Sequence, residues 1–332
     1  MTLPPLVALI GPTGVGKTLD AVELAERIGA EVISADSRLL YRGMDIGTAK
    51  PSPELRRRVA HHLIDVADPE QVWSLAEYRQ AALQAIQDIR SRSKLPLLVG
   101  GTGQYITAIL EGWTPPVGAA DPALRRELEA YAAEHGPAGL HRRLQQVDPA
   151  RAAALDPRNV RRVVRALEVY QLTGRRPSEL QGQSTPAFRS LWLGLSLPRP
   201  VLYRRIDDRI RRMLQGGLLD EVRALLERGL TPDHPTMSGI GYRQVAEHLL
   251  GQKSLDEAEA EMRRLTRQFV RRQANWFKPD DERIHWFVAD NEVVTRMAAR
   301  VKGWLGNPSV ERAARSVPDE AGPERPGQPA RR

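Results

Sequence analysis

Residues 6–28 read LVALIGPTGVGKTLDAVELAERI, and this stretch determines the fold class. The apolar run 6–10 predicts a buried strand, the glycine-rich stretch 11–18 a tight loop, and the amphipathic stretch 19–28 a helix. The loop matches the pattern G-x-x-x-x-G-K-[ST] in the strand–loop–helix context that the pattern requires. Small residues there let successive backbone N–H groups converge on an oxyanion at the positive end of the helix. Residues 11–18, called the phosphate loop below, therefore predict an anion site.

Two side chains of the phosphate loop add to the chemistry of its backbone. Lys17 supplies a positive charge beside the anion, and the Thr18 hydroxyl is a candidate ligand of Mg²⁺. Kinases, NTPases and diphosphate-handling enzymes all use such a loop, so it does not identify the reaction. The expected phosphate- or diphosphate-binding residues are Gly11, Pro12, Thr13, Gly14, Val15, Gly16, Lys17 and Thr18.

Further strands and helices alternate along the chain. Residues 31–36 and 95–99 predict strands, residues 73–89 predict a helix between them, and residues 189–197 predict a fourth strand. Strands separated by helices indicate a parallel sheet, in which ligands bind at the carboxyl ends of the strands. We therefore expect an α/β protein with a P-loop NTPase-like parallel sheet flanked by helices.

The middle of the chain has a different pattern. Residues 121–184 contain helical periodicity and no convincing strand, so they predict an all-helical domain inserted into the α/β core. The core then comprises residues 1–120 and 185–306, and it is expected to be helical from residue 203 onward. Residues 307–332 carry several prolines and few large apolar side chains, which predicts a disordered tail.

Composition restricts the class of protein. The chain has 332 residues, of which 41% are hydrophobic and 27% charged, as is typical of a soluble globular protein. It has no cysteine, which excludes thiolate nucleophiles and cysteine-ligated zinc. The net charge of +8 favours polyanionic partners. Its first apolar run, 3–10, is far shorter than the roughly 20 residues of a membrane helix, so we expect a cytoplasmic protein that does not bind membranes.

A carboxylate stands close to the phosphate loop in the predicted sheet. Asp36 ends the strand 31–36, and its side chain should lie at the carboxyl edge near the loop. An isolated Asp-Ser pair would be interpreted as the cap of a turn. Here Tyr41 and the run MDIGTAKP, residues 44–51, follow closely and favour a functional role.

Six further motifs follow the phosphate loop in order, and together with it they resemble the tRNA dimethylallyltransferases, also called tRNA isopentenyltransferases. The resemblance covers about residues 6–287. The motifs are DSRLLYRGMDIGTAKP (36–51), HHLIDVADP (61–69), GGTGQYI (100–106), RALEVY (165–170), GYRQ (241–244) and TRQFVRRQANWF (266–277).

The resemblance implies transfer of a dimethylallyl group from dimethylallyl diphosphate to N6 of adenine 37, beside the anticodon of tRNA, with release of diphosphate and no use of ATP. A carboxylate that accepts the amine proton would help such a reaction, and Asp36 is the candidate base. The phosphate loop, Lys17, Mg²⁺ and an arginine would stabilise the leaving diphosphate. By correspondence with the family, the further catalytic residues are Thr102 and Arg209. On a helical wheel Arg209 lies at the edge of an apolar stripe.

Basic clusters indicate contacts with tRNA phosphates. One cluster belongs to the predicted insertion and another to residues 263–278, where no acidic residue intervenes. A single charge run is usually a solvated helix face, but two such runs beside this site favour tRNA binding. His61 and His62 are interpreted as structural. By family correspondence, the tRNA path is lined by Asp36, Ser37, Arg38, Leu39, Thr102, Arg125, Arg161, Arg162, Arg165, Ser238, Gly241, Tyr242 and Arg243.

Three other interpretations of the sequence differ in their use of these motifs. An adenylate-type prenyltransferase would have a similar loop and aspartate but would not need a basic helical insertion. A small-molecule or nucleoside kinase would bind ATP in the loop and leave the other motifs without a role. A non-catalytic RNA-binding protein would not need Lys17, Thr18 and Asp36 intact. We expect a monomer that binds tRNA through its anticodon stem-loop.

Overall fold

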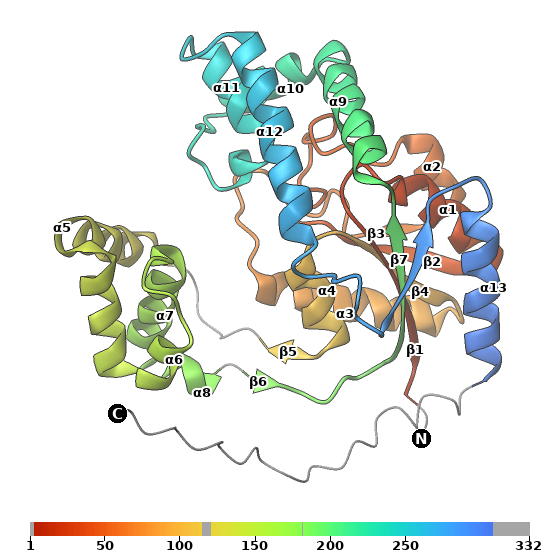
Figure 1. Ribbon diagram of the computed structural model, residues 1–332, viewed down its shortest axis with the longest axis horizontal. Coiled ribbons are helices and arrows are strands. Elements are labelled where there is room, and N and C mark those ends of the chain that lie inside the picture. Colours follow the sequence, from red (N-terminus) through yellow and green to blue (C-terminus); the bar gives the residue numbers. More distant parts are fainter. Residues whose placement is uncertain (1–2, 115–120, 181, 308–332) are drawn as a thin grey trace, which may run out of the picture.

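A computed structural model describes residues 3–114, 121–180 and 182–307 (Figure 1). Its centre is a six-stranded sheet in the order β3-β2-β4-β1-β7-β8, and every neighbouring pair is parallel. The predicted α/β fold with a P-loop NTPase-like parallel sheet is confirmed. The strands are β1 (Pro5–Ile10), β2 (Ala30–Ala35), β3 (His61–His62), β4 (Leu95–Gly100), β7 (Arg189–Ser196) and β8 (Ile284–Val288).

Helices cover both faces of the sheet, which explains why its central strands are apolar along their length. On one face α1 (Lys17–Ile28) packs against α13 (Val293–Gly306), and on the other α3 (Leu75–Ser91) packs against α4 (Gly103–Leu110) (Figure 1). The short helix α2 (Pro53–Arg58) lies beside α1.

The register of three strands brings their loops together. Both Ile10 of β1 and Ala35 of β2 pair with Gly100 of β4. The chain therefore leaves these three strands at one level of the sheet, toward the phosphate loop, Asp36 and Thr102. This edge is where ligands bind in open parallel sheets.

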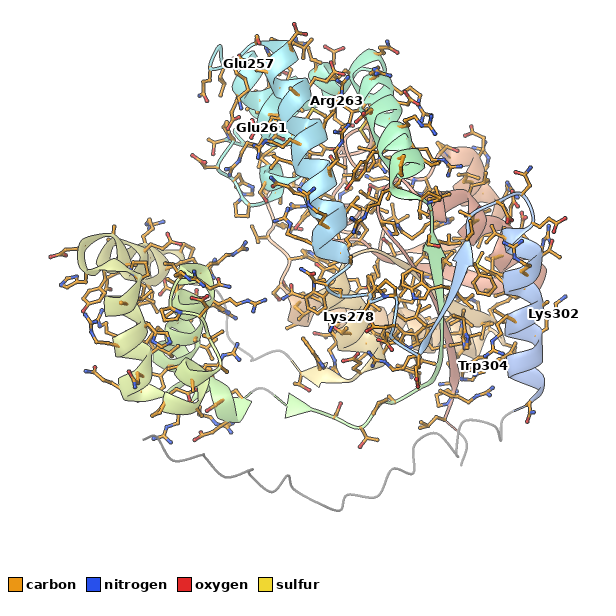
Figure 2. The ribbon with its side chains drawn as sticks, viewed as in Figure 1. Glu257, Glu261, Arg263, Lys278, Lys302 and Trp304 are labelled. Carbon is orange, nitrogen blue, oxygen red and sulfur yellow. The ribbon has the colours of Figure 1, made fainter. Side chains whose placement is uncertain are left out.

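A group of helices extends beyond this carboxyl edge. Figure 1 shows α9 rising from the end of β7, and α12 running back from the outer end of the group toward the sheet. Figure 2 places Glu257 near the outer end of α12 and Lys278, just after the helix, near the sheet. The members of the group are α9 (Arg199–Gln215), α10 (Leu218–Glu227), the 3₁₀ turn η1 (Thr236–Ser238), α11 (Tyr242–Leu249) and α12 (Leu255–Gln273).

Two strands of the central sheet, β3 and β8, were missing from the sequence-based prediction. The region after residue 203 was expected to be helical, which was wrong for β8, since this strand pairs with β7 at the edge of the sheet. Its sequence IHWFV is rich in β-branched and aromatic residues, but five residues between helical stretches carry little periodicity. The two-residue strand β3 is likewise too short to be recognised from sequence.

The inserted segment has a core of its own. Its helices are α5 (Pro122–Val147), α6 (Pro149–Ala153), α7 (Val160–Thr173) and α8 (Pro177–Leu180). Buried side chains such as Leu140 and Leu167 form a cluster separate from the main core. The expected all-helical character is incomplete, because β6 (Gly182–Gln183) pairs with β5 (Trp113–Thr114) where the chain leaves and re-enters the core. The tail predicted for 307–332 lies, apart from Asn307, outside the described residues.

Nothing in the described helices could cross a membrane, since none is both long and apolar enough.

Leu9→Ala tests the importance of the central strand. The Leu9 side chain is fully buried in β1, so its truncation should lower the free energy of unfolding by about 2–5 kcal/mol through lost contacts and a cavity. Leu250→Ala, at a side chain that is 52% exposed, should change it by only about 0.5 kcal/mol. Urea unfolding measures both, and equal losses would contradict the expected burial of β1.

Candidate active site

Several N–H groups of the phosphate loop have no acceptor among the described residues. Gly11 has φ +153°, and a Cβ there would lie 2.7 Å from the carbonyl oxygen of Leu195, so only glycine fits between β1 and β7. Within the described part of the chain, no protein acceptor is hydrogen-bonded to the N–H of Gly14, Gly16, Lys17 or Thr18. The first N–H groups of a helix lack intrahelical acceptors, and together with the helix dipole they favour an anion.

Two members of the predicted anion site contribute differently. Pro12 has no N–H to donate. The N–H of Thr13 is already bound by the side-chain oxygen of Gln273, at 2.9 Å, so it does not face an anion in this structure.

Lys17 is the half-buried cation of the loop. Its Nζ donates to the carbonyl oxygens of Gly11 and Pro12, each at 2.8 Å. Burial lowers the pKa of Lys17 to about 8, the negative charge of Asp36 opposes this shift, and the positive charge of Arg209 adds to it. The predicted catalytic residues Lys17, Asp36 and Arg209 therefore lie within electrostatic reach of one another.

Asp36 and Thr102 occupy adjoining turns. Asp36 Oδ1 accepts from the N–H of Arg38 at 2.9 Å, so this carboxylate does cap its turn. Its second oxygen has no hydrogen-bond partner in the part of the chain that the structure describes. The N–H of Thr102 donates to Ala35 O at 3.2 Å, and Thr102 Oγ1 accepts from the N–H of Ser37 at 3.2 Å. These bonds connect the end of β2 directly to the end of β4.

Arg209 reaches the phosphate loop from α9. Its Nη1 donates to Thr13 Oγ1 at 3.4 Å and its Nη2 to Thr48 O at 3.3 Å. Burial lowers the pKa of the guanidinium, while the charge of Asp36 raises it. A second arginine that sequence reasoning missed, Arg205, lies one turn earlier and donates to Val15 O at 3.0 Å.

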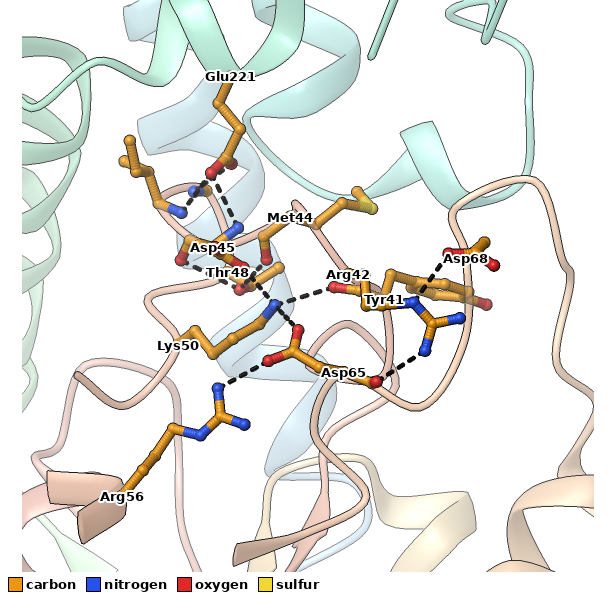
Figure 3. A network of polar contacts seen from close by, with 12 residues as sticks. Tyr41, Arg42, Met44, Asp45, Thr48, Lys50, Arg56, Asp65, Asp68 and Glu221 are labelled. Atoms are coloured by element: carbon orange, nitrogen blue, oxygen red, sulfur yellow. Dashed lines mark hydrogen bonds and ion pairs between the residues drawn. The ribbon is translucent and has the colours of Figure 1, made fainter. Parts of the chain in front are cut away.

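A polar network holds the segment that contacts Arg209 (Figure 3). Residues 44–50, called the 44–50 loop, turn back over α10, where the Glu221 carboxylate accepts from the N–H groups of Asp45, Ile46 and Gly47 at 2.7–3.1 Å. The Tyr242 hydroxyl donates to the same carboxylate at 2.6 Å. Burial, together with the adjacent Glu221, raises the pKa of Tyr242, so this hydroxyl keeps its proton.

Lys50 anchors the other end of the 44–50 loop. Its Nζ is almost fully buried and donates to Tyr41 O at 2.9 Å and to the carboxylates of Asp45 and Asp65. Although burial raises the pKa of Asp65, the hydrogen bonds from Lys50 and Arg56 hold it below its usual value. The motif 44–51 was noticed in the sequence, but the roles of Lys50 and Glu221 depend on contacts between distant segments.

Apart from Thr102, the predicted tRNA-contact residues outside the insertion lie in two adjoining segments. Arg38 donates to the carbonyl oxygens of Pro235 and Thr236 and to Ser238 Oγ, at 2.9–3.2 Å, so residues 36–39 and 235–243 are tied together. The half-buried Leu39 accepts the N–H of Asp65 through its carbonyl oxygen.

Other members of the second segment have structural contacts. Gly241 donates its N–H to Gln244 Oε1 at 2.9 Å at the start of α11. Tyr242 is buried, and Arg243 donates to Pro232 O at 3.0 Å.

In the insertion, the predicted arginines differ in their surroundings. Arg125 and Arg165 both pair with Glu168, whose side chain is fully buried, at 2.9 and 2.7 Å. Arg161 and Arg162 are exposed on α7. The first two therefore also stabilise the insertion, whereas the second pair faces solvent.

The basic stretch of α12 is partly neutralised by carboxylates that the sequence pattern did not connect with it. Arg263 pairs with Glu259, Arg264 with Glu261, and Arg267 with Asp207 of α9. Arg271 and Arg272 are exposed.

The predicted Mg²⁺ ligand fits the general chemistry of that ion. The Thr18 hydroxyl has no hydrogen-bond partner among the residues described. Mg²⁺ commonly takes one or two protein ligands and completes its shell with substrate phosphate oxygens and water. Among the same residues, no three His, Cys, Asp or Glu side chains form a self-sufficient metal site. His61 and His62 contact Val59 O and Glu31, which agrees with a structural role.

The pKa of Lys17 predicts how anion binding depends on pH. Since this pKa is lowered from 10.5 to about 8, the free protein loses the Lys17 charge as pH rises through about 8. The affinity for inorganic diphosphate should therefore fall between pH 7 and 9.5, as measured by titration calorimetry. Lys17→Met should bind more weakly, and the ratio of the two affinities should approach one at high pH. A ratio that stays constant over this range would contradict the assignment.

Glu221→Gln tests whether the carboxylate holds the 44–50 loop. The amide retains one oxygen but puts an NH₂ group where the other accepted, so at least one loop N–H loses a charged acceptor, a contact worth about 1.5–3 kcal/mol. Hydrogen exchange at residues 45–47 should accelerate about 10-fold or more. Glu227→Gln, at an exposed position of the same helix, is the matched control and should leave these rates unchanged.

Comparisons with known proteins agree with this architecture. The family model described as IPP transferase matches residues 39–280. A tRNA dimethylallyltransferase from Thermomicrobium roseum is 51% identical over 283 residues, covering 85% of this chain and 86% of the relative. A crystal structure of a tRNA isopentenylpyrophosphate transferase from Bacillus halodurans is 39% identical with a TM-score of 0.69, covering 93% of this chain and 99% of the other.

A second structural neighbour is a eukaryotic dimethylallyltransferase described as acting on tRNA. It is 27% identical with a TM-score of 0.77, covering 91% of this chain and 79% of the other. The likeness thus extends over nearly the whole of this chain, insertion and core together. The chain belongs to the IPP transferase family.

Proposed function

We propose that this protein transfers a dimethylallyl group from dimethylallyl diphosphate to N6 of adenine 37 in tRNA. The relatives named above are tRNA dimethylallyltransferases or tRNA isopentenylpyrophosphate transferases, which supports this reaction class. The observation that carries the proposal is that the phosphate loop and Asp36 follow strands that end at one level of the sheet, with Arg209 bonded to the loop and Asp36 near enough to influence the charges of Lys17 and Arg209. An anion cradle and a carboxylate base are the two parts that the transfer requires.

The acceptor half of the reaction belongs to Asp36. The N6 amine of adenine is a weak nucleophile because its lone pair is delocalised into the ring. As N6 forms its bond with the first carbon of the allyl group, the free carboxylate oxygen of Asp36 accepts one of its protons. The other oxygen remains bound to the N–H of Arg38, which holds the carboxylate in place.

The phosphate loop acts on the leaving group of the reaction. The bond between the allylic carbon and its oxygen breaks, and the electron pair departs with diphosphate. The unpaired N–H groups of the loop, Lys17 and Arg209 are placed to stabilise that charge. Thr18 would hold Mg²⁺ together with diphosphate oxygens, and the ion would further neutralise the leaving group.

Recognition of tRNA is proposed to use the exposed arginines of the insertion and the segments around Arg38 and Ser238. Adenine inside a stacked loop cannot reach Asp36, so the base must be unstacked, as in other enzymes that modify a single base. The expectations of a monomer and of a cytoplasmic location stay predictions.

Incubation with unmodified tRNA, Mg²⁺ and labelled dimethylallyl diphosphate tests the proposal. Label should appear in tRNA without ATP, and nuclease digestion should place it on adenine 37. Label on AMP added to the same mixture would favour the adenylate-type enzyme, and hydrolysis of added ATP or phosphoryl transfer from it, with no label in tRNA, would favour a kinase.

Asp36→Asn removes the proposed base but keeps the side-chain oxygen that caps the turn. Asparagine retains an oxygen for the N–H of Arg38 but cannot accept the N6 proton, so the single-turnover rate should fall about 10²-fold or more. Binding of inorganic diphosphate should change little. Asp88→Asn, at an exposed position on α3, is the control. An unchanged rate in Asp36→Asn would remove Asp36 from the role of base.

A further inference from the structure

Gln273 is a buried polar residue that the reaction described above leaves without a role. It is the last residue of α12, where the helix meets the carboxyl edge of the sheet, and it is only 5% exposed. Glutamine is mostly a surface residue, and a buried side-chain amide is retained where each of its polar groups has a partner.

Both ends of this amide have a backbone partner, and the partners come from different loops. Oε1 accepts from the N–H of Thr13 at 2.9 Å, and Nε2 donates to Gly101 O at 3.0 Å. The amide oxygen faces a donor and the amide nitrogen faces an acceptor. Both hydrogen bonds therefore form in only one of the two orientations of the amide. Gln273 therefore joins the phosphate loop to the turn after β4.

The two loops carry opposite halves of the proposed chemistry. Thr13 Oγ1 accepts from Arg209, on the leaving-group side. Gly101 precedes Thr102, whose hydroxyl accepts from the N–H of the residue after Asp36, on the acceptor side. The amide of Gln273 thus joins the loop on the leaving-group side to the turn on the acceptor side. In the proposed reaction both sides act on the same transfer step.

The fit around the amide is tight. A Cβ on Gly101 would lie 2.2 Å from Nε2 of Gln273 and 3.3 Å from Gly11 O. No side chain larger than hydrogen fits at residue 101 while Gln273 makes its two hydrogen bonds. The end of α12 therefore sits directly on both loops.

We propose that Gln273 is a positioning residue that fixes the distance between the diphosphate cradle and the Asp36 base. This role rests on the proposed function. The phosphate loop follows β1 and the turn at 101–102 follows β4, and the pairing of these two strands ends at Ile10 and Gly100. Beyond that level, the two hydrogen bonds of Gln273 join the loops. Displacement of about 1 Å between reacting groups can cost on the order of 10²-fold in rate.

Gln273→Met removes both hydrogen bonds and retains the length of the side chain. The single-turnover rate of dimethylallyl transfer should fall about 10- to 100-fold, while the dissociation constants for tRNA and for inorganic diphosphate each change less than about 3-fold. Gly101→Ala should give the same pattern by pushing the amide away. Gln87→Met, at an exposed position on α3, is the matched control and should behave as wild type.

Gln273→Glu provides a readout that a merely structural role would not change. The charged carboxylate accepts from Thr13 but repels Gly101 O, whereas the protonated acid donates an O–H to Gly101 O and restores both bonds. The rate of this variant relative to wild type should therefore rise as pH is lowered from 8 to 5.5, while that of Gln273→Met relative to wild type stays flat.

Three outcomes would overturn the role of Gln273. They are a wild-type rate in Gln273→Met, a loss of rate matched by an equal loss of binding or of thermal stability, and a flat pH ratio for Gln273→Glu. If the wild-type protein transfers no label, the proposed function fails, and the positioning role fails with it. An active wild type with any of the three outcomes rejects the positioning role alone.

Discussion

The site depends on the register of β1, β2 and β4. Because the last residues of β1 and β2 both pair with Gly100, three loops begin at the same level of the sheet. Backbone hydrogen bonds inside a sheet buried on both faces resist any shift of one strand along another, since a shift would leave polar groups unpaired. The anion cradle and the carboxylate therefore start from a rigid edge, and only short segments separate them from it.

Buried charge is the second constraint. Lys17 and Arg209 are both partly withdrawn from water, and this burial lowers the pKa of each. Carbonyl oxygens of the phosphate loop and of the 44–50 loop accept their hydrogen bonds, and Asp36 supplies an opposite charge. This arrangement places positive charge where an anion can bind. The attraction between that charge and the anion is stronger than it would be in water, because the protein screens charges less than water does.

Distant segments hold this arrangement in place. Glu221 binds three N–H groups of the 44–50 loop, that loop accepts from Arg209, and Gln273 connects the phosphate loop with the turn after β4. Each contact removes a degree of freedom from a loop that would otherwise move relative to the sheet. The insertion is organised differently, since Glu168 gathers Arg125 and Arg165 within it and leaves Arg161 and Arg162 exposed.

The sequence by itself determined the strand, loop and helix around residues 11–18, the parallel sheet and the candidates Lys17 and Asp36, because local periodicity and motif spacing carry that information. Arg209 became a candidate through the resemblance to the family. The sequence did not predict β8, because this strand of five residues is recognised only from its pairing with β7. Nor could it assign Gln273 to Thr13, 260 positions away, or distinguish the arginines that pair with carboxylates from those that face solvent. Such contacts depend on which segments the fold brings together, and only the tertiary structure decided them.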